Sequence, residues 1–531
     1  MAEMSKRRLL PVGLQSFEGI RKEGYLYVDK TDLVWQLVNN GSKYDYLSRP
    51  RRFGKSLLVD TLACYLSGKK ELFEGLKIMD LEQDWVKRPV IRFDMSRGGA
   101  NATTLRSYLD YRFEYYEKMY GIVPKATASL ANRFDGIVRT ACEQTGQKVA
   151  ILIDEYDSPL QHSWHTPHHE ECTAVYREVF AILKADDNYE QFVFITGITK
   201  FTQISLFSVM NNLVNISFFP EYAALCGITE QEIADNFQPE MQRLAEQNGW
   251  TLKEAHGRLK DYYDGYHFSR RNMVDVYNPF SLVNALNSGE LGNFWVSSGA
   301  TSMLPKFVTD AEIRMGSFEN CGISKDILES SDVTGGGAEL FLYQSGYLTI
   351  KDSNEFGYIL GFPNQEVRKA LFDSVLPALT LRQQGDTVSM QYNLSYQLGT
   401  GQPDEAMKTL KSLIADVPYS NKKLASMDME ERYRLIISTV LKAIGLQVEV
   451  ERQHAKGRID IVAKTSRYIY VLELKLSNNG GVQAAEEQMA AKQYLEPFLA
   501  DGRTVIGLAI ELDAEGKGLM NWSIIELGMR N

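Results

Sequence analysis

Residues 44–56 of this chain read Tyr-Asp-Tyr-Leu-Ser-Arg-Pro-Arg-Arg-Phe-Gly-Lys-Ser, an apolar run that leads into a basic turn. A phosphate-binding P-loop has the pattern G-x-x-x-x-G-K-[ST], in which bare backbone amides surround the phosphates of a nucleotide. The Gly-Lys-Ser of this pattern stands at residues 54–56, whereas Arg49 occupies the first glycine position. Good helix formers follow from Leu57 onward, and the N-terminus of such a helix favours an anion. The stretch therefore predicts a strand, a phosphate-binding loop and a helix.

The chemistry of the loop suggests a role for each of its side chains. Lys55 can reach the β- and γ-phosphates of a nucleotide, and the Ser56 hydroxyl can ligate Mg²⁺. Two of the loop arginines are candidates either for phosphate contacts or for ion pairs with carboxylates at a domain surface. The cofactor-binding residues that we expect in this stretch are Arg51, Arg52, Phe53, Gly54, Lys55, Ser56 and Leu57.

A second acidic motif supports the nucleotide site. Residues 149–157 read Val-Ala-Ile-Leu-Ile-Asp-Glu-Tyr-Asp, so that five apolar residues end in adjacent acids. Asp154 at the strand tip can hold the Mg²⁺ shell, and Glu155 can orient or deprotonate the attacking water. Thr196 ends the next apolar run and is a candidate sensor of the γ-phosphate. The alternative is a plain basic turn and a solvated strand end, but the presence of both motifs favours a nucleotide site.

Four apolar runs in the first 200 residues predict the fold of this part. They are separated by amphipathic helical stretches, a pattern typical of a parallel β-sheet with helices on both faces. The second run stands between the P-loop and the second acidic motif, which suits the P-loop subgroup with a catalytic glutamate beside the metal-binding aspartate. The four runs are residues 44–47, 89–95, 149–153 and 192–196.

Further along the chain the pattern changes twice. From about residue 226 it becomes mainly helical, and the turn-forming residues 399–403 are the clearest linker signal. The last part reads as helix, strand, hairpin, helix and strand, which indicates a separate α/β unit. We therefore expect an ATPase domain at 1–225, a mainly helical lid or middle region at 226–400 and a third domain at 401–531.

The third domain contains a second candidate site on a predicted β-hairpin. Side chains alternate along a strand, so Glu473 and Lys475 share one face, and Asp460 on the partner strand can join them. Two carboxylates and an ammonium group suit metal-assisted phosphodiester hydrolysis, in which Asp460 and Glu473 bind the metal and Lys475 places or activates the water. Glu430 borders the apolar face of the predicted helix 429–444 and is the candidate third acid. Gln488 can contact a backbone phosphate.

Two alternatives remain open for this hairpin. The first is a surface hairpin with ordinary cross-strand pairing of acidic and basic side chains. The second is a degenerate nuclease fold that binds nucleic acid without cutting it. Spacing alone does not decide between these alternatives and a nuclease site.

Composition limits the class of protein. The chain has 531 residues, a formal net charge of −10 and a pI near 5.5, so its whole surface is not expected to attract nucleic acid. Its five cysteines form no C-x-x-C pair, which argues against a disulfide framework and a zinc ribbon. No run approaches the ~18 apolar residues of a membrane span. These features predict a soluble, cytoplasmic protein that does not bind a membrane.

Several motifs together resemble a known bacterial family. The resemblance covers nearly the whole chain and points to the AAA-ATPase-like family, whose members commonly end in a PD-(D/E)XK nuclease-like domain. The motifs that carry it are YVDKT (27–31), LSRPRRFGKSLL (47–58), ILIDEYDSP (151–159), ITGITKF (195–201), YNPFSL (277–282), GRIDIV (457–462), YVLELKL (470–476) and EEQMAAKQYLEPF (486–498).

The resemblance implies a function for both sites. Lys55 and Ser56 would bind nucleotide and Mg²⁺ with Asp154 and Glu155, and Asp460, Glu473 and Lys475 would form the nuclease signature with Glu430 as the helix acid. We therefore expect ATP and Mg²⁺ as cofactors, with Mn²⁺ as an alternative at the nuclease site. DNA or RNA is the expected partner, and a homo-oligomer is compatible with the resemblance. ATP hydrolysis would be coupled to cutting; the alternative is a nucleotide-dependent switch whose tail binds nucleic acid or a protein without cutting.

Overall fold

The structure is a computed structural model that forms two compact units. The first comprises residues 1–295 and 320–364, and the second comprises 296–319 and 365–531. The residues that the structure describes are 8–125, 127–185, 187–200, 213–269, 271, 274–297, 318, 320–330, 337–380, 384–415, 428–454 and 456–526.

The first unit is built around a five-stranded parallel sheet with the order β2-β3-β4-β1-β5. The parallel sheet expected from the sequence is therefore confirmed. In space, β4 lies between the P-loop strand β1 and the acidic strand β3, and the carboxyl ends of all three meet at one edge. This edge holds the candidate nucleotide site. The strands are β1 (Tyr44–Ser48), β2 (Val90–Asp94), β3 (Val149–Asp154), β4 (Glu190–Gly197) and β5 (Val214–Asn215).

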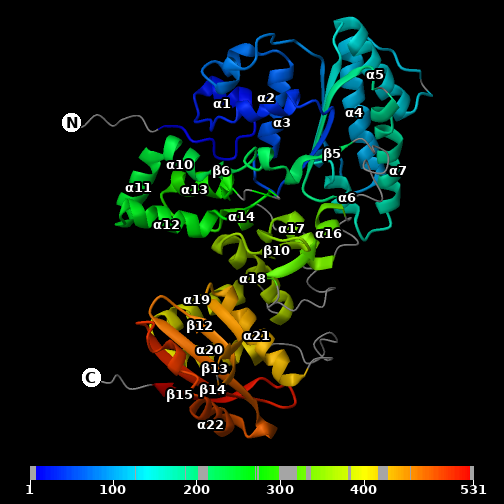
Figure 1. Ribbon diagram of the computed structural model, residues 1–531. Helices are drawn as coiled ribbons and strands as arrows, with labels where there is room; N and C mark the ends of the chain where they lie inside the picture. Colours follow the sequence, from blue (N-terminus) through cyan, green and yellow to red (C-terminus); the bar gives the residue numbers. More distant parts are fainter. Residues whose placement is uncertain are drawn as a thin grey trace. The chain divides into compact units, whose positions relative to one another are not determined.

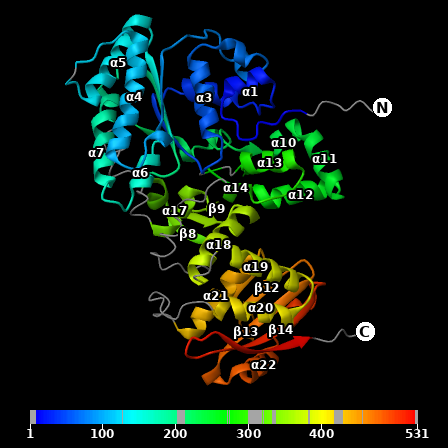
Figure 2. The same ribbon diagram turned by 180° about the vertical axis from the view of Figure 1, so that it is seen from behind.

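Helices cover both faces of this sheet (Figures 1 and 2). The helices α1 and α3 lie on one side, and α4, α5 and α7 lie on the other. Helix α3 begins at Lys55, directly after Gly54, whose φ of 86° is a left-handed conformation that suits glycine. The helices of this part are α1 (Phe17–Glu23), α2 (Thr31–Asn39), α3 (Lys55–Leu66), α4 (Ala102–Tyr120), α5 (Leu130–Thr145), α6 (Ser158–Ser163), α7 (His169–Phe180) and α8 (Ile182–Ala185).

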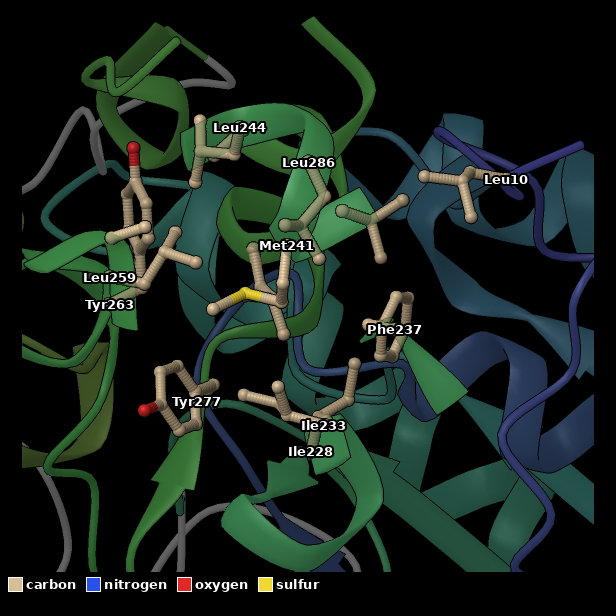
Figure 3. Packing of buried hydrophobic residues seen from close by; sticks show 14 of the residues in the cluster. Leu10, Ile228, Ile233, Phe237, Met241, Leu244, Leu259, Tyr263, Tyr277 and Leu286 are labelled. Atoms are coloured by element: carbon tan, nitrogen blue, oxygen red, sulfur yellow. The ribbon is translucent and has the colours of Figure 1, made fainter. Parts of the chain in front are cut away.

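The remainder of the first unit is helical with two small sheets. Its helices α10 and α12 each begin with a capping box, at Thr229 and Thr251, and their apolar faces meet in a buried cluster (Figure 3). The antiparallel three-stranded sheet β8-β10-β9 follows. The elements are β6 (Ile228–Thr229), α10 (Glu230–Asn236), α11 (Gln238–Asn248), α12 (Leu252–Tyr263), β7 (Val276–Tyr277), α13 (Pro279–Ser288), α14 (Phe294–Ser297), β8 (Cys321–Ser324), α16 (Lys325–Ser330), α17 (Gly337–Ser345), β9 (Thr349–Ser353) and β10 (Gly357–Gly361).

The second unit contains a five-stranded mixed sheet with the order β11-β12-β13-β14-β15. Helix α21 packs on β11 to β13 and α22 packs on β13 to β15, and the middle residues of β13 are buried on both faces. The expected linker at 399–403 is the turn between α19 and α20 within this unit. The elements are α18 (Gln365–Thr380), α19 (Gln384–Gly399), α20 (Pro403–Ala415), α21 (Met429–Ala443), β11 (Gln447–His454), β12 (Gly457–Lys464), β13 (Tyr468–Leu476), α22 (Gly481–Lys492), β14 (Thr504–Leu512) and β15 (Leu519–Glu526).

None of the helices that the structure describes combines the length and the apolar character that a membrane span requires.

Candidate nucleotide and nuclease-like sites

Arg49, at the first glycine position of the P-loop pattern, supports the loop from inside the protein. Its buried guanidinium donates hydrogen bonds to the carbonyl oxygens of Ser48 (2.8 Å), Ser217 (2.9 Å) and Tyr222 (2.9 Å). It also lies 4.2 Å from the centroid of the Phe268 ring, a cation–π contact. Burial lowers the pKa of Arg49 to about 10. This arginine therefore fixes the loop to distant parts of the chain.

Other side chains of the loop also contact the helical part of the first unit. Phe53 is buried, and its ring centroid lies 4.7 Å from that of Tyr266 in an edge-on contact. Arg52 has a left-handed backbone with φ of 68°, and its guanidinium lies 4.8 Å from the centroid of the Phe280 ring. Arg51 is half-buried beside them. The side chain of Phe53, one of the predicted cofactor-binding residues, thus packs in the protein interior.

Lys55 is buried between the loop and the acidic strand end. Its ammonium group donates to the carbonyl oxygens of Arg49 (2.9 Å) and Pro50 (3.0 Å). Burial lowers the pKa of Lys55, and the nearby carboxylates of Glu155 and Asp154 oppose this shift. The lysine is thus at the predicted site, with its charge held by the loop's own carbonyl groups.

Asp154 and Glu155 follow at the carboxyl end of β3. Asp154 is 3% exposed, and its Oδ1 accepts no hydrogen bond from the residues that the structure describes. Burial raises its pKa, and the Ser56 side chain, which lies within hydrogen-bonding range, opposes this. Glu155 has a φ of 49°, and burial raises the pKa of its carboxyl while Lys55 opposes the shift. The structure therefore brings together the P-loop lysine, the serine and both acids.

The end of β4 completes this edge of the sheet. Thr196 is buried, and its Oγ1 has no hydrogen-bond partner within the described part of the chain. Its carbonyl oxygen accepts from the backbone N–H of Tyr156 at 3.0 Å, which joins β4 to the acidic turn. Asp157, which has no predicted role, accepts hydrogen bonds through its buried carboxylate from the backbone just after Thr196. The repeated acid in Asp-Glu-Tyr-Asp was the available signal.

In the second unit, Asp460, Glu473 and Lys475 lie together. In the antiparallel pairing of β12 with β13, Ile461 lies opposite Leu472. Asp460 and Glu473 are the next residues along the two strands. Asp460 Oδ2 accepts from the backbone N–H of Leu474 at 2.9 Å, and Glu473 Oε1 accepts from Lys475 Nζ at 3.1 Å. Glu473 is 1% exposed, and its Oε2 has no hydrogen-bond partner in the described ranges. Burial, reinforced by the Asp460 charge, raises the pKa of Glu473.

Helix α21 brings two further charged groups to this site. Glu430 is half-buried; burial and the Asp460 charge raise its pKa, and Lys475 opposes them. Glu431 is exposed, so the helix faces differ as the periodicity predicts. Arg434, one turn further along, lies with Nε 3.6 Å from Asp460 Oδ1. Arg434 was not among the predicted site residues, because its helical spacing alone does not show which strand it faces.

Gln488 on α22 forms a hydrogen bond with Glu473. Its side-chain amide donates to Glu473 Oε1 and to the Tyr494 hydroxyl (3.0 Å), which in turn donates to the carbonyl oxygen of Arg458 (2.8 Å). Gln488 thus contacts a carboxylate, and the phosphate contact suggested for it stays a prediction. Hydrogen bonds to a ligating carboxylate orient it for a metal.

Both sites have the donor chemistry that a hard divalent cation needs. Such ions prefer carboxylate and hydroxyl oxygens, and a buried carboxylate oxygen without a partner carries a desolvation cost that a cation would relieve. Asp154 with Ser56, and Glu473 with Asp460, provide these oxygens. The residues therefore fit the magnesium ion that the sequence predicts at each site.

The fold and the two sites define a P-loop ATPase-like protein with a nuclease-like C-terminal unit. Residues 11–207 match the family described as predicted AAA-ATPase, and residues 428–522 match the PD-(D/E)XK nuclease superfamily. A protein of Azotobacter chroococcum mcd 1, described as an uncharacterized protein in the vnfD 5′ region, is 30% identical over 540 residues, covering 98% of this chain and 100% of that protein. The chain belongs to the AAA-ATPase-like family with a C-terminal PD-(D/E)XK domain. The expected resemblance is confirmed.

Solved structures give more distant matches. The Aeropyrum pernix ORC2 protein, in ADPNP–ADP complexes, is 13% identical and has a TM-score of 0.24, covering 64% of this chain and 90% of its own. The Aeropyrum pernix ORC1 protein, in complex with DNA, is 11% identical with a TM-score of 0.23, covering 64% and 89%.

Proposed function

We propose that this protein binds and hydrolyses ATP and that its C-terminal unit is a metal-dependent nuclease acting on DNA or RNA under the control of the nucleotide state. The observation that supports this best is common to both sites. In each, a buried carboxylate lies near a lysine and has one oxygen without a hydrogen-bond partner among the described residues: Oδ1 of Asp154 and Oε2 of Glu473.

At the nucleotide site, each residue would have a separate role. Lys55 would leave the carbonyl groups of its own loop to bind the β- and γ-phosphates. Ser56 and Asp154 would hold Mg²⁺, which neutralises phosphate charge when it is bound. Glu155 would orient the attacking water and accept its proton, a role that its raised pKa favours because a base works best with a pKa nearer neutrality. Thr196 would contact the γ-phosphate.

At the nuclease-like site, Asp460 and Glu473 would hold the metal, with Glu430 as the third acid. The metal would supply charge neutralisation at the scissile phosphate. Lys475 Nζ, which now bonds Glu473, would place or activate the water nucleophile. Gln488 would keep the Glu473 carboxylate in place by its hydrogen bond. The protein side chains thus supply both the metal ligands and the water-positioning group.

A cleavage panel tests this proposal. Single- and double-stranded DNA and RNA would be incubated with Mg²⁺ or Mn²⁺, with and without ATP, while phosphate release is followed in parallel. We expect Lys55→Ala to lose ATP binding and Glu473→Ala to lose cleavage by about 10³-fold, since the metal would lose a ligand. Glu430→Gln should reduce cleavage, whereas the matched variant of its exposed neighbour, Glu431→Gln, should not.

Each part of the proposal has its own refuting result. A wild-type protein that binds ATP without releasing phosphate would refute the hydrolysis. A cleavage rate that is the same with and without ATP, and in Lys55→Ala, would refute the coupling. Cleavage that survives Glu473→Ala would refute the assigned nuclease site.

One observation favours a second candidate function, a nucleotide-dependent switch whose tail binds nucleic acid or a protein without cutting. The Arg434 guanidinium lies near Asp460 and supplies positive charge close to the expected metal position. A tail that binds oligonucleotides in the panel but leaves them uncut with every metal would establish this function in place of the nuclease.

A further inference from the structure

Asp157 is a buried acid that lies two residues beyond Glu155. It is 1% exposed, and a single oxygen, Oδ2, accepts four hydrogen bonds. Two come from the backbone N–H groups of Ile198 (3.0 Å) and Thr199 (2.6 Å). The others come from the Thr199 hydroxyl (2.6 Å) and the Gln161 side-chain amide (2.6 Å). The carboxylate therefore fastens the turn after β3 to the chain that leaves β4.

Neighbouring contacts make these two segments one rigid body. The backbone N–H of Tyr156 donates to the Thr196 carbonyl oxygen (3.0 Å), and its phenol donates to the Thr199 carbonyl oxygen (2.9 Å). At Gly197, a Cβ atom would lie 2.7 Å from Asp157 Oδ1, so this approach requires glycine. The acidic turn and the end of β4 can thus hardly move apart without breaking the Asp157 bonds.

The hydrogen bonds of Asp157 affect the backbone conformation of Glu155. Its φ of 49° is a left-handed conformation, which is unfavourable for a residue with a Cβ, so the surroundings must hold it. The turn that continues from Glu155 is held by Tyr156 and Asp157. Without the Asp157 bonds, the turn could relax and the Glu155 carboxylate would leave its place.

We propose that Asp157 is a positioning residue for ATP hydrolysis, acting through Glu155; the inference rests on the proposed function. The four donors around Oδ2 occupy this oxygen of Asp157, so that it serves to hold the turn. An asparagine keeps the size and can place its one acceptor oxygen where Oδ2 lies, but a neutral amide oxygen accepts these four hydrogen bonds more weakly than a carboxylate oxygen does. Substitution should therefore displace Glu155 while the nucleotide still binds.

A double-mutant cycle in the full-length protein tests the inference. Phosphate release would be measured for wild type, Asp157→Asn, Glu155→Gln and the double variant, with binding of a slowly hydrolysed ATP analogue measured by calorimetry. We expect Asp157→Asn to lower kcat by about 10- to 100-fold, since a displacement of about 1 Å can cost 10²-fold, with analogue affinity within about 3-fold of wild type. In the Glu155→Gln background the same change should have little further effect.

Two further variants keep the test decisive. Thr199→Val removes one donor and leaves both backbone donors, so it should give a smaller fall in kcat in a protein that folds. Asp45→Asn changes another buried aspartate, at the opposite end of β1, and should leave kcat unchanged.

The outcomes separate the two proposals. Equal losses of kcat from Asp157→Asn in both backgrounds would overturn the action through Glu155. Loss of melting temperature with unchanged kcat in Asp157→Asn and Thr199→Val would show a purely structural residue and also overturn it. A wild type that binds the analogue but releases no phosphate from ATP would instead refute the proposed function, and the inference with it.

Discussion

Asp45 should make the first unit less stable at neutral pH than in mild acid. It lies on β1 and is 0% exposed, with Phe194 of β4 on one side and Val214 of β5 on the other. Burial raises its pKa from 3.8 to about 6, and the side chains of Ser42 and Asn40 oppose the shift only in part. The native state therefore favours the protonated acid, whereas the unfolded chain does not.

The sign and size of the effect follow from this difference. Because the folded-state pKa lies above the unfolded value, the protonated group favours folding fully below about pH 4, and this advantage is lost as the pH rises through about 6. A shift of about 2 units corresponds to about 3 kcal/mol. Asp45→Asn, which keeps the shape and removes the charge, should thus have almost no effect at pH 4 and stabilise the unit by up to about 3 kcal/mol at pH 7.5.

Urea unfolding of the wild type and Asp45→Asn at a series of pH values, followed by tryptophan fluorescence, would measure this difference in the free energy of unfolding. The signal reports mainly on the first unit, which contains five of the six tryptophans of the chain: Trp35, Trp85, Trp164, Trp250 and Trp295. The exposed Asp261 provides a control, because Asp261→Asn should change the transition little at any pH. A stabilisation by Asp45→Asn that is the same at pH 4 and pH 7.5, or a loss of stability at pH 7.5, would refute the reasoning.

Three other changes have expected outcomes. Arg49→Met removes the donor of three carbonyl oxygens and should lower the stability of the first unit by about 2–4 kcal/mol, measured by thermal melting. Lys55→Ala should weaken ATP binding by at least about 10-fold, because the phosphates lose a charged hydrogen bond, as calorimetry would show. Gln488→Leu removes a hydrogen bond to Glu473 and should raise the Mg²⁺ concentration for half-maximal cleavage by about 10-fold; an unchanged titration would contradict the assigned role.

The sequence predicted the elements whose patterns are local. Four apolar runs became the strands β1 to β4, and the helix expected from Leu57 onward begins two residues earlier, at Lys55, directly after Gly54. The alternation along β13 put Glu473 and Lys475 on one face, where the structure joins them by a hydrogen bond. The helical period placed Glu430 toward the site and Glu431 toward solvent. These features depend on spacing within a few residues.

The parts that the sequence did not reveal depend on distant partners. Arg49 stands in a basic run that suggests a phosphate contact, but two of its acceptors come from Ser217 and Tyr222, far along the chain. The position of β4 between β1 and β3 is likewise a matter of pairing across the sheet. Gln488 has an acceptor on a different element, as does Arg434. A helical or strand period shows which way a side chain faces, but it does not identify its partner.

The two lysines suggest which site is the natural point of control. Lys475 already bonds the acid beside it, so a cation that binds the free oxygen of Glu473 finds the hydrogen bond in place. Lys55 instead gives its ammonium group to the carbonyl oxygens of Arg49 and Pro50, and a nucleotide must draw it away from both. Those residues belong to the loop that Arg49 and Phe53 attach to the helical part of the first unit. Under the proposed function, nucleotide binding would break contacts of a loop that is attached beyond the site, whereas metal binding at the tail would not, and the nucleotide step would be the one that transmits a change.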